Sequence, residues 1–273
     1  MFEVQQKQSG LSATVSLFEV IYHATVRNLR KTHSNALVGL FLNILQNMML
    51  VGIFYIMYSV LGLRGSLVRG DFLIYIMSGI FLYMTHVKTL GAVASSEGPA
   101  SPMMQHAPMN TFVAIVSGAL SQLYLQVLSV LLVLYVYHIA FKPIEIHDPV
   151  GAFSMLLLAW FSGVAVGLNF LALKPWFPQF VSIGSQVYTR ANMIASGKMF
   201  LANTLPYTMV AMFSWNPLFH VIDQSRGYAF INYNPHYSNW QYPLIVSVAL
   251  LMTGFMGEAY TRKHASLSWG ARR

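Results

Sequence analysis

The most prominent feature of the sequence is a series of long apolar stretches separated by short polar segments. A stretch of roughly 20 apolar residues is long enough to cross the hydrocarbon core of a bilayer as a helix. Helices are the expected spanning elements, because each one satisfies its own backbone hydrogen bonds away from water. We therefore predict an all-α integral membrane protein whose six transmembrane helices lie at about 36–62, 72–94, 111–141, 150–173, 180–201 and 241–260.

The composition favours the same class of protein. Hydrophobic residues make up 56% of the 273 residues and charged residues only 9%, whereas a soluble domain carries roughly 25% charged residues. The chain has no cysteine, which excludes disulfides, thiolate chemistry and cysteine-based metal sites. In a membrane protein, the formal charge of +8 is expected in cytoplasmic loops and ends and is not a sign of nucleic-acid binding.

The segment ahead of the first predicted span has a different pattern. Apolar residues recur near helical spacing from 11 to 31, and Arg27, Arg30 and Lys31 close the segment. This pattern is typical of an amphipathic helix that lies along the inner face of a membrane. An ordinary solvated helix is the alternative.

Six spans place both chain ends on one side of the membrane, and the charges indicate which side. The segment 1–35 and the tail from Glu258 each carry four Lys and Arg residues, and basic residues collect on the cytoplasmic side. We predict cytoplasmic termini, with the spans within 36–262 and a cytoplasmic tail at 263–273.

The segment 202–240 is too long for a simple loop and too apolar to sit fully in water. We predict two short re-entrant helices, near 205–213 and 217–230, that dip into the outer leaflet and close the outer end of the bundle. Irregular backbone at such a depth is tolerated where it packs on protein or lines a wet cavity. Asp223 and Arg226, three residues apart, are expected to pair along the second helix.

The residues offer little catalytic or metal chemistry. Ser196-Gly197-Lys198 resembles the end of a phosphate-binding loop. However, Asn192 stands in place of the first glycine, Met199 in place of the final Ser or Thr, and no strand precedes them. The nine histidines include no i,i+4 pair within the spans and loops, so no metal site is predicted. The eight acidic residues lie in loops, in the first helix or at span ends, which argues against a proton relay and against paired-carboxylate catalysis.

The stretch WNPLFHVIDQSRGYAF at 215–230 resembles the Asn-Pro-Leu-x-His-hydrophobic-hydrophobic-acid-x-x-Arg signature of type-2 ABC exporter permeases. That signature lies between the fifth and sixth spans of the family. The likeness extends to chain length, span number, the amphipathic start and the basic tail, and it is closest to the capsular polysaccharide and O-antigen export subgroup. The chain departs from the family at Gln46-Asn47, where a Glu-Pro pair is usual. The matching residues are Asn216, Pro217, Leu218, His220, Asp223 and Arg226.

The resemblance implies a permease subunit that exports a capsule-type, lipid-linked glycan across the bacterial inner membrane. The functional unit would be a homodimer of this chain with two cytoplasmic ATPase subunits. ATP would bind to those partners, so this chain would hold no cofactor and would not itself be an enzyme. Further implied contacts are the lipid bilayer and periplasmic or outer-membrane export proteins, with no nucleic acid. An outer gate motif would comprise Asn216, Pro217, His220, Asp223 and Arg226.

The resemblance also implies a glycan pathway between the two copies, lined by the first and fifth spans. Aromatic faces suit sugar rings, although rings on a span also serve as lipid-facing belt residues. Arg190 is expected to face the pathway beside Gln186 and Asn192, because an ionised side chain near mid-bilayer avoids lipid. Lys198, nearer the outer end, is expected to snorkel. The candidate pathway residues are Phe54, Tyr55, Tyr58, Arg190 and Lys198.

The predicted inward loop at 95–110 is the candidate contact with the ATPase. Its prolines give a stiff turn, and its methionines give an adaptable apolar contact. Together with the helix at 11–31, this loop would carry ATP-driven motion into the spans; a passive connector is the alternative. The candidate coupling residues are Glu97, Pro99, Pro102, Met103 and Met104.

Two other functional classes stay open from the sequence. The first is a permease of the same fold that exports a drug or a lipid. The second is a membrane enzyme or scaffold with no transport role. Co-purification of an ATPase would exclude the second class, and loss of surface polysaccharide on deletion would separate glycan export from drug export.

Overall fold

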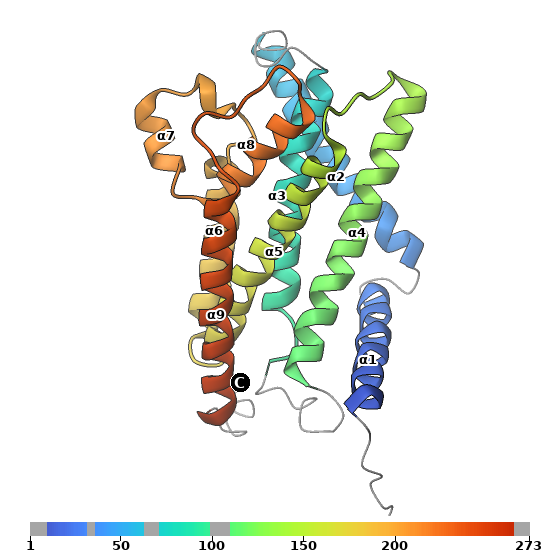
Figure 1. Cartoon of the computed structure of the whole chain (residues 1–273), viewed down its shortest axis with the longest axis vertical. Coiled ribbons are helices and arrows are strands. Elements are labelled where there is room, and N and C mark those ends of the chain that lie inside the picture. Colours follow the sequence, from blue (N-terminus) through green and yellow to red (C-terminus); the bar gives the residue numbers. More distant parts are fainter. Residues whose placement is uncertain (1–9, 32–35, 63–70, 99–109, 265–273) are drawn as a thin grey trace, which may run out of the picture.

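The computed structural model describes residues 10–31, 36–62, 71–98 and 110–264, and all regular structure in these ranges is helical (Figure 1). The all-α prediction is therefore confirmed for the described residues. We call the end of the bundle that holds residues 202–240 the cap end. The helices are α1 (Gly10–Lys31), α2 (Ala36–Val60), α3 (Phe72–Ala94), α4 (Thr111–Ala140), α5 (Pro149–Leu173), α6 (Pro178–Ala195), α7 (Tyr207–Phe213), α8 (Pro217–Ala229) and α9 (Gln241–His264).

Local sequence signals set where several of these helices begin. Asp71 accepts a hydrogen bond from the backbone N–H of Leu73 at 2.9 Å, ahead of α3. Asp148 caps α5 in the same way, accepting from Gly151 at 3.0 Å. Such caps satisfy donors that a helix leaves unpaired in its first turn. Prolines stand in the first turns of α5, α6 and α8, where the missing N–H costs no intrahelical bond.

The bundle is built around the close packing of α3 against α5. Gly163 and Gly167 on α5 face the backbone of α3, so a Cβ at Gly163 would lie 2.5 Å from the carbonyl oxygen of His86. A Cβ at Gly167 would lie 2.8 Å from the carbonyl oxygen of Leu90. Small residues four apart let two helices approach closely, which is how helices associate in a membrane. Helices α8 and α9 pack on other faces of α5.

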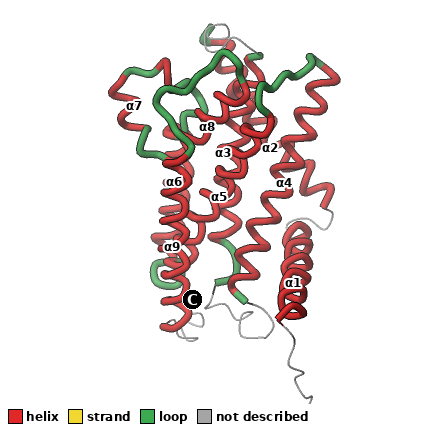
Figure 2. The backbone as a smooth tube through the Cα atoms, viewed as in Figure 1, coloured by secondary structure: helices red, strands yellow, loops and turns green. Residues whose placement is uncertain are grey.

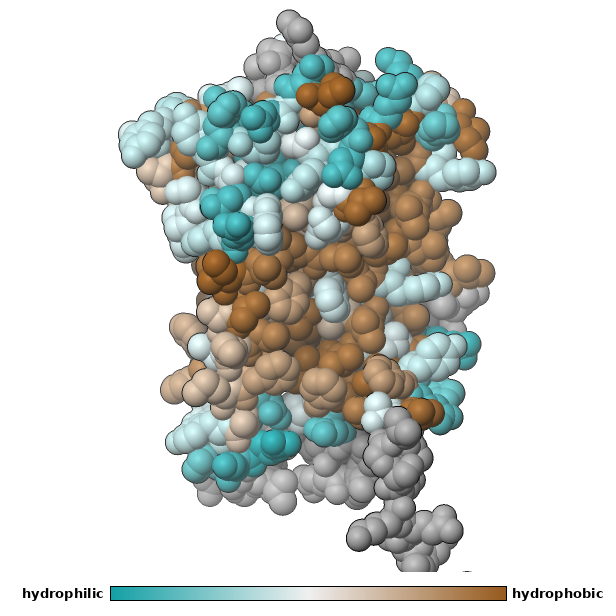
Figure 3. Space-filling model, in the orientation of Figure 1, coloured by the Kyte–Doolittle hydropathy of each residue, from teal (hydrophilic) through white to brown (hydrophobic). Residues whose placement is uncertain are grey.

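The surface supports a multi-pass membrane protein. On the face of the molecule shown in Figure 3, a broad apolar band crosses the middle, between polar surfaces at the two ends. The described residues contain five helices that are long and apolar enough to cross a membrane: Leu37–Val60, Phe72–Ala94, Thr111–Ala140, Pro149–Leu173 and Gln241–His264.

The structure differs from the prediction at the fifth expected span, 180–201. The helix here, α6, begins at Pro178 and ends at Ala195, and it is not among the five strongly apolar helices. Gly197 ends it by adopting a φ of 70°, a conformation that favours glycine. A Cβ at this position would also lie 2.7 Å from the ring of Phe219. Ser196-Gly197-Lys198 therefore terminates a helix, whereas a phosphate-binding loop precedes one.

The first helix and the two short helices have close to their predicted bounds. α1 packs on the first turns of α4, where Ile21 and Ala24 contact Val113. α7 and α8 lie at the cap end among the loops that gather there (Figure 2). The apolar face of α8 contributes Leu218 and Ile222 to a buried cluster shared with α3 and α5.

Candidate functional site

Asn216 joins the start of α8 to the end of α6. Its side-chain oxygen accepts from the backbone N–H of Leu218 at 3.1 Å and so caps α8. Its side-chain amide donates to the carbonyl oxygen of Ala195 and to Oδ1 of Asn192, both at 2.9 Å. One buried amide therefore satisfies both helix ends, which orients α8 relative to α6.

Arg226 fixes the irregular backbone that follows α6. Its guanidinium donates to the carbonyl oxygens of Gly197 at 2.9 Å, Lys198 at 2.6 Å and Phe200 at 2.7 Å. The side chain is only 1% exposed, and its guanidinium carbon lies 4.3 Å from the centre of the Tyr75 ring. The planar fork of arginine suits several carbonyls at once, so Arg226 acts here as a cap for the broken end of α6.

Asp223 has partners other than Arg226. It accepts from the hydroxyl of Tyr233 and from the hydroxyl of Ser238 at 2.6 Å. Burial is the larger cause, and the nearby charge of Asp223 the second, that raises the pKa of Tyr233. The phenol therefore stays protonated and donates the hydrogen bond. The expected pairing of Asp223 with Arg226 is wrong, because the two side chains point to different loops and form no ion pair within the described residues.

His220 is held as a neutral ring between two backbone groups. Nε2 lies 2.6 Å from the carbonyl oxygen of Ser214, which can only accept, so Nε2 carries the proton. Nδ1 accepts from the backbone N–H of Asn239 at 3.1 Å. Burial lowers the pKa of His220, in agreement with this neutral tautomer. Pro217, the remaining residue of the proposed gate motif, lies in the first turn of α8. Every polar residue of the motif is hydrogen-bonded to a surrounding segment. The role of the motif as a gate stays a prediction.

The prediction that Lys198 snorkels to an interface, made from its position near the span end, is wrong. It is 3% exposed, and its Nζ lies 3.6 Å from the centre of the Tyr83 ring and 5.0 Å from that of Phe54. Among the described residues, Nζ has no hydrogen-bond partner. The break after α6 turns the chain inward, so cation–π contacts take the place of water.

The aromatic residues of α2 lie in two different settings, the buried core and the wall of a cavity. Phe54 contacts Lys198 inside the bundle. Tyr58 is equally buried and belongs to the same core cluster. Tyr55 is half-buried and lines a cavity between α2, α3 and α4. The structure thus does not bring the three rings together on one exposed face.

Arg190 lies on the exposed polar side of α6. A groove of about 500 Å³ runs between α3 and α6, and Arg190 lines it with Gln186 and Lys174. Ser182, Ser185 and Thr189 add hydroxyl groups to the same wall. Asn192, expected beside Arg190, is instead buried against Asn216.

Only one of the candidate coupling residues lies in the described part of the chain. Glu97, just after α3, lines a polar cavity of about 560 Å³ together with Arg27 and Arg30 of α1. The remaining candidates lie outside the described residues: Pro99, Pro102, Met103 and Met104.

The sequence reasoning missed a polar cluster inside the bundle. Lys88 of α3 donates to side-chain oxygens of Asn43 and, at 3.0 Å, Gln46 on α2. Gln126 of α4 donates to the same Asn43 oxygen at 3.2 Å, and Asn43 donates to Ser129 at 2.7 Å. Polar residues inside spans usually face one another, and the i,i+4 amides Asn43 and Asn47 were a usable signal.

Comparison with known proteins adds no identification. The sequence matches no family model and no curated protein. The class defined by the fold is that of an all-helical, multi-pass membrane protein. Within the described residues, no group of three or more His, Asp or Glu side chains could hold a metal ion.

Proposed function

We propose that the chain is the permease subunit of an ABC exporter and moves a capsule-type, lipid-linked glycan across the bacterial inner membrane. Two copies would form the pathway, and a separate ATPase would supply the energy. The observation that carries this proposal is α6, a helix that runs alongside the bundle but is poorly covered by it. Of its 18 residues, only Val181 and Asn192 are buried.

The exposed surface of α6 suits neither lipid nor water alone. Phe180, Ile183 and Val187 form an apolar ridge with exposed fractions of 59–64%. Next to it, Gln186 and Arg190 line the groove against α3. An arginine facing lipid near mid-bilayer would cost at least about 2.5–3.5 kcal/mol. A second copy packed on the ridge would leave the polar side facing a water-filled space, and α6 would then cross the membrane as a sixth span.

The chemistry of the groove suits a glycan. Hydroxyl and amide side chains both donate and accept hydrogen bonds, as sugar hydroxyls require. Arg190 and Lys174 add positive charge that would attract acidic sugar substituents or phosphates. A volume near 500 Å³ lies within the roughly 300–1,000 Å³ of ordinary ligand pockets.

The position of α8 supports re-entrant helices that close the outer end of the pathway. Leu218 and Ile222 of α8 pack in one cluster with Leu82 of α3 and Leu158 of α5. Leu82 lies ten residues after the start of α3, which is about 15 Å along a helix. That depth is about half of a hydrocarbon core of roughly 30 Å.

The groove can be tested with Arg190→Ala, Arg190→Lys and Gly91→Leu, scoring protein level and surface polysaccharide in cells. A pathway role predicts normal protein level with export reduced most in Arg190→Ala and less in Arg190→Lys. Gly91→Leu should also reduce export, because a Cβ at Gly91 meets no atom within 4 Å and the larger side chain fills the groove without disturbing the core. Gly91→Ala is the matched control. Normal export by both Arg190→Ala and Gly91→Leu would overturn the proposal.

A further inference from the structure

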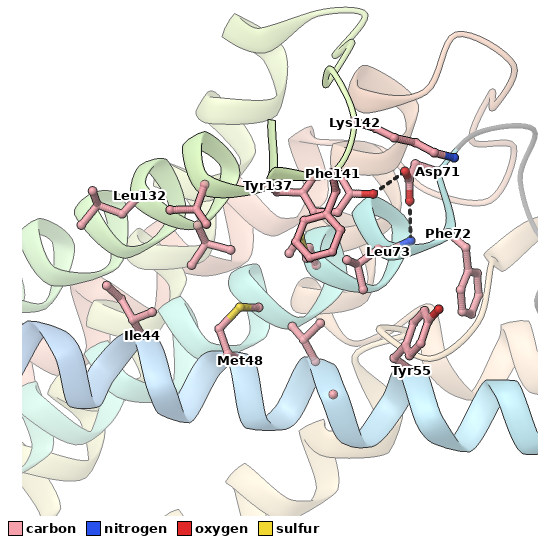
Figure 4. A pocket seen from close by; sticks show the side chains of 15 residues that line it. Ile44, Met48, Tyr55, Asp71, Phe72, Leu73, Leu132, Tyr137, Phe141 and Lys142 are labelled. Carbon is pink, nitrogen blue, oxygen red and sulfur yellow. Dashed lines mark hydrogen bonds between the residues drawn. The ribbon is translucent and has the colours of Figure 1, made fainter. Parts of the chain in front are cut away.

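A cavity of about 880 Å³ lies between α2, α3 and α4 and approaches the cap end (Figure 4). One wall is a single face of α2, where Ile44, Met48 and Tyr55 follow one another along the helix. The interval from Ile44 to Tyr55 is 11 residues, or about 16 Å of helix. Most of the other lining residues are also apolar, so the cavity is a long and largely apolar channel.

Polar groups gather at one end of this channel. The hydroxyl of Tyr137 donates to Oδ2 of Asp71 at 2.5 Å, while Oδ1 of Asp71 accepts from the backbone N–H of Leu73. Both carboxylate oxygens are therefore already engaged. Lys142 lies at the same end (Figure 4). Lys142 is exposed and forms no ion pair within the described residues, so its ammonium group can bind an anionic partner.

The channel opens on the side of the molecule that faces hydrocarbon. Leu132 and Val136 of α4 line it and are also 37% and 57% exposed. On α2, Met49 and Ile53 beside the lining face are 54% and 61% exposed. Both helices are long and apolar enough to cross a membrane, so the opening lies within the apolar band.

We propose that this cavity is a binding site for a membrane phospholipid, with one acyl chain along α2 and the phosphate at Lys142. The apolar length of about 16 Å equals roughly half of a 30 Å hydrocarbon core, which is the depth of one leaflet. The polar end lies where α3 begins and α4 ends, as a headgroup requires. This inference does not depend on what the protein exports.

Gly52 makes the cavity testable, because it lies in the lining of α2 and a Cβ there would meet no atom within 4 Å. Gly52→Leu should therefore fill the channel without displacing protein atoms. Leucine also favours a helix more than glycine does, so the thermal midpoint of this variant should not fall. Ala249→Leu introduces the same side chain at an exposed position of α9, away from this cavity, and serves as the matched control.

The test uses the full chain, extracted in a mild detergent, with retained phospholipid measured by mass spectrometry. A phospholipid with a photoreactive group near its acyl terminus is added in membranes to map the contact. We expect cross-links in the peptide 44–55, a several-fold loss of retained phospholipid in Gly52→Leu, and unchanged retention in Ala249→Leu. Lys142→Ala should lower retention, and Lys142→Arg should restore it.

Three results would overturn the site. One is equal lipid retention in Gly52→Leu and in the unmodified chain. Another is photolabelling spread evenly over the apolar band with no preference for 44–55. The third is a disulfide between two copies of a Met48→Cys variant, since a second chain would then occupy the channel. If Gly52→Leu fails to fold, the photolabelling of the unmodified chain still decides the question.

Discussion

Buried polar side chains give the cap end its shape. The polar residues of α8 and its cap bind different segments. Asn216 binds the end of α6, and His220 binds the backbone at Ser214 and Asn239. Arg226 binds the backbone carbonyls between Gly197 and Phe200. A buried backbone group without a partner costs about 1–3 kcal/mol. These side chains therefore stabilise an irregular segment that apolar packing alone would leave unsatisfied.

Arg226→Lys should destabilise the protein although it keeps the charge. A lysine ammonium cannot span the three carbonyls that the guanidinium reaches, so at least one would lose its partner, at a cost on the order of 2 kcal/mol. The thermal midpoint in detergent should fall clearly, whereas Arg190→Lys, at an exposed position, should leave it unchanged. A midpoint for Arg226→Lys equal to that of the unmodified protein would contradict this role.

His220 should make stability depend on pH. Burial lowers its pKa in the folded protein, while the unfolded value is near 6.5. Below about pH 6.5 the histidine is protonated more readily in the unfolded state than in the folded state. The contribution of neutral His220 to stability is therefore complete above that pH and is lost as the pH falls toward the folded pKa. Protonation would also remove the acceptor used by Asn239.

The measurement for His220 is the thermal midpoint at pH 7.5 and pH 5.5, chosen to bracket a pKa of about 6.5, in the unmodified protein and in His220→Gln. Glutamine offers a donor and an acceptor but does not titrate. The unmodified protein should lose more stability between the two pH values than His220→Gln does. Equal losses would show that another group governs the pH dependence.

At the scale of elements, helix positions followed from the sequence more reliably than side-chain partners. Long uncharged apolar runs predicted α3, α4, α5 and α9 closely. The partners of Asp223 and Arg226 could not be found in this way. Arg226 binds carbonyls 26–29 residues away along the chain, and helical spacing carries no information about such contacts. The burial of Lys198 could not be predicted for the same reason, because it depends on the break in the helix at Gly197.

The topology of the chain depends on whether α6 crosses the membrane. The helix spans 18 residues, or about 27 Å, but its polar side keeps it outside the five strongly apolar helices. Six crossings place both termini on one side of the membrane, and five place them on opposite sides. Reporters fused before Met1 and after Arg273 should both report the cytoplasm. A cytoplasmic reporter at one end and an external one at the other would show that α6 does not cross.

At the scale of the whole molecule, the proposed pathway requires a second copy of the chain. The apolar band of Figure 3 suits lipid, but the exposed α6 combines an apolar ridge with Arg190 and Gln186. A two-fold assembly along α6 would cover the ridge and enclose the polar groove. The proposed export pathway depends on this assembly, because a pathway between copies requires that they meet here.

A single-cysteine series tests that claim most directly, since the natural chain has no cysteine. Single cysteines are placed at three exposed positions of α6, Ile183, Val187 and Ile194. Exposed Tyr135 of α4 is replaced by cysteine as the control, and each variant is oxidised in membranes. If two copies meet along α6, one or more α6 positions should give a disulfide-linked product at twice the mass of the 30.6 kDa chain, and Tyr135→Cys should give none. A disulfide needs Cα atoms within about 7 Å of each other. Cross-linking at Tyr135→Cys with none along α6 would contradict an assembly through α6.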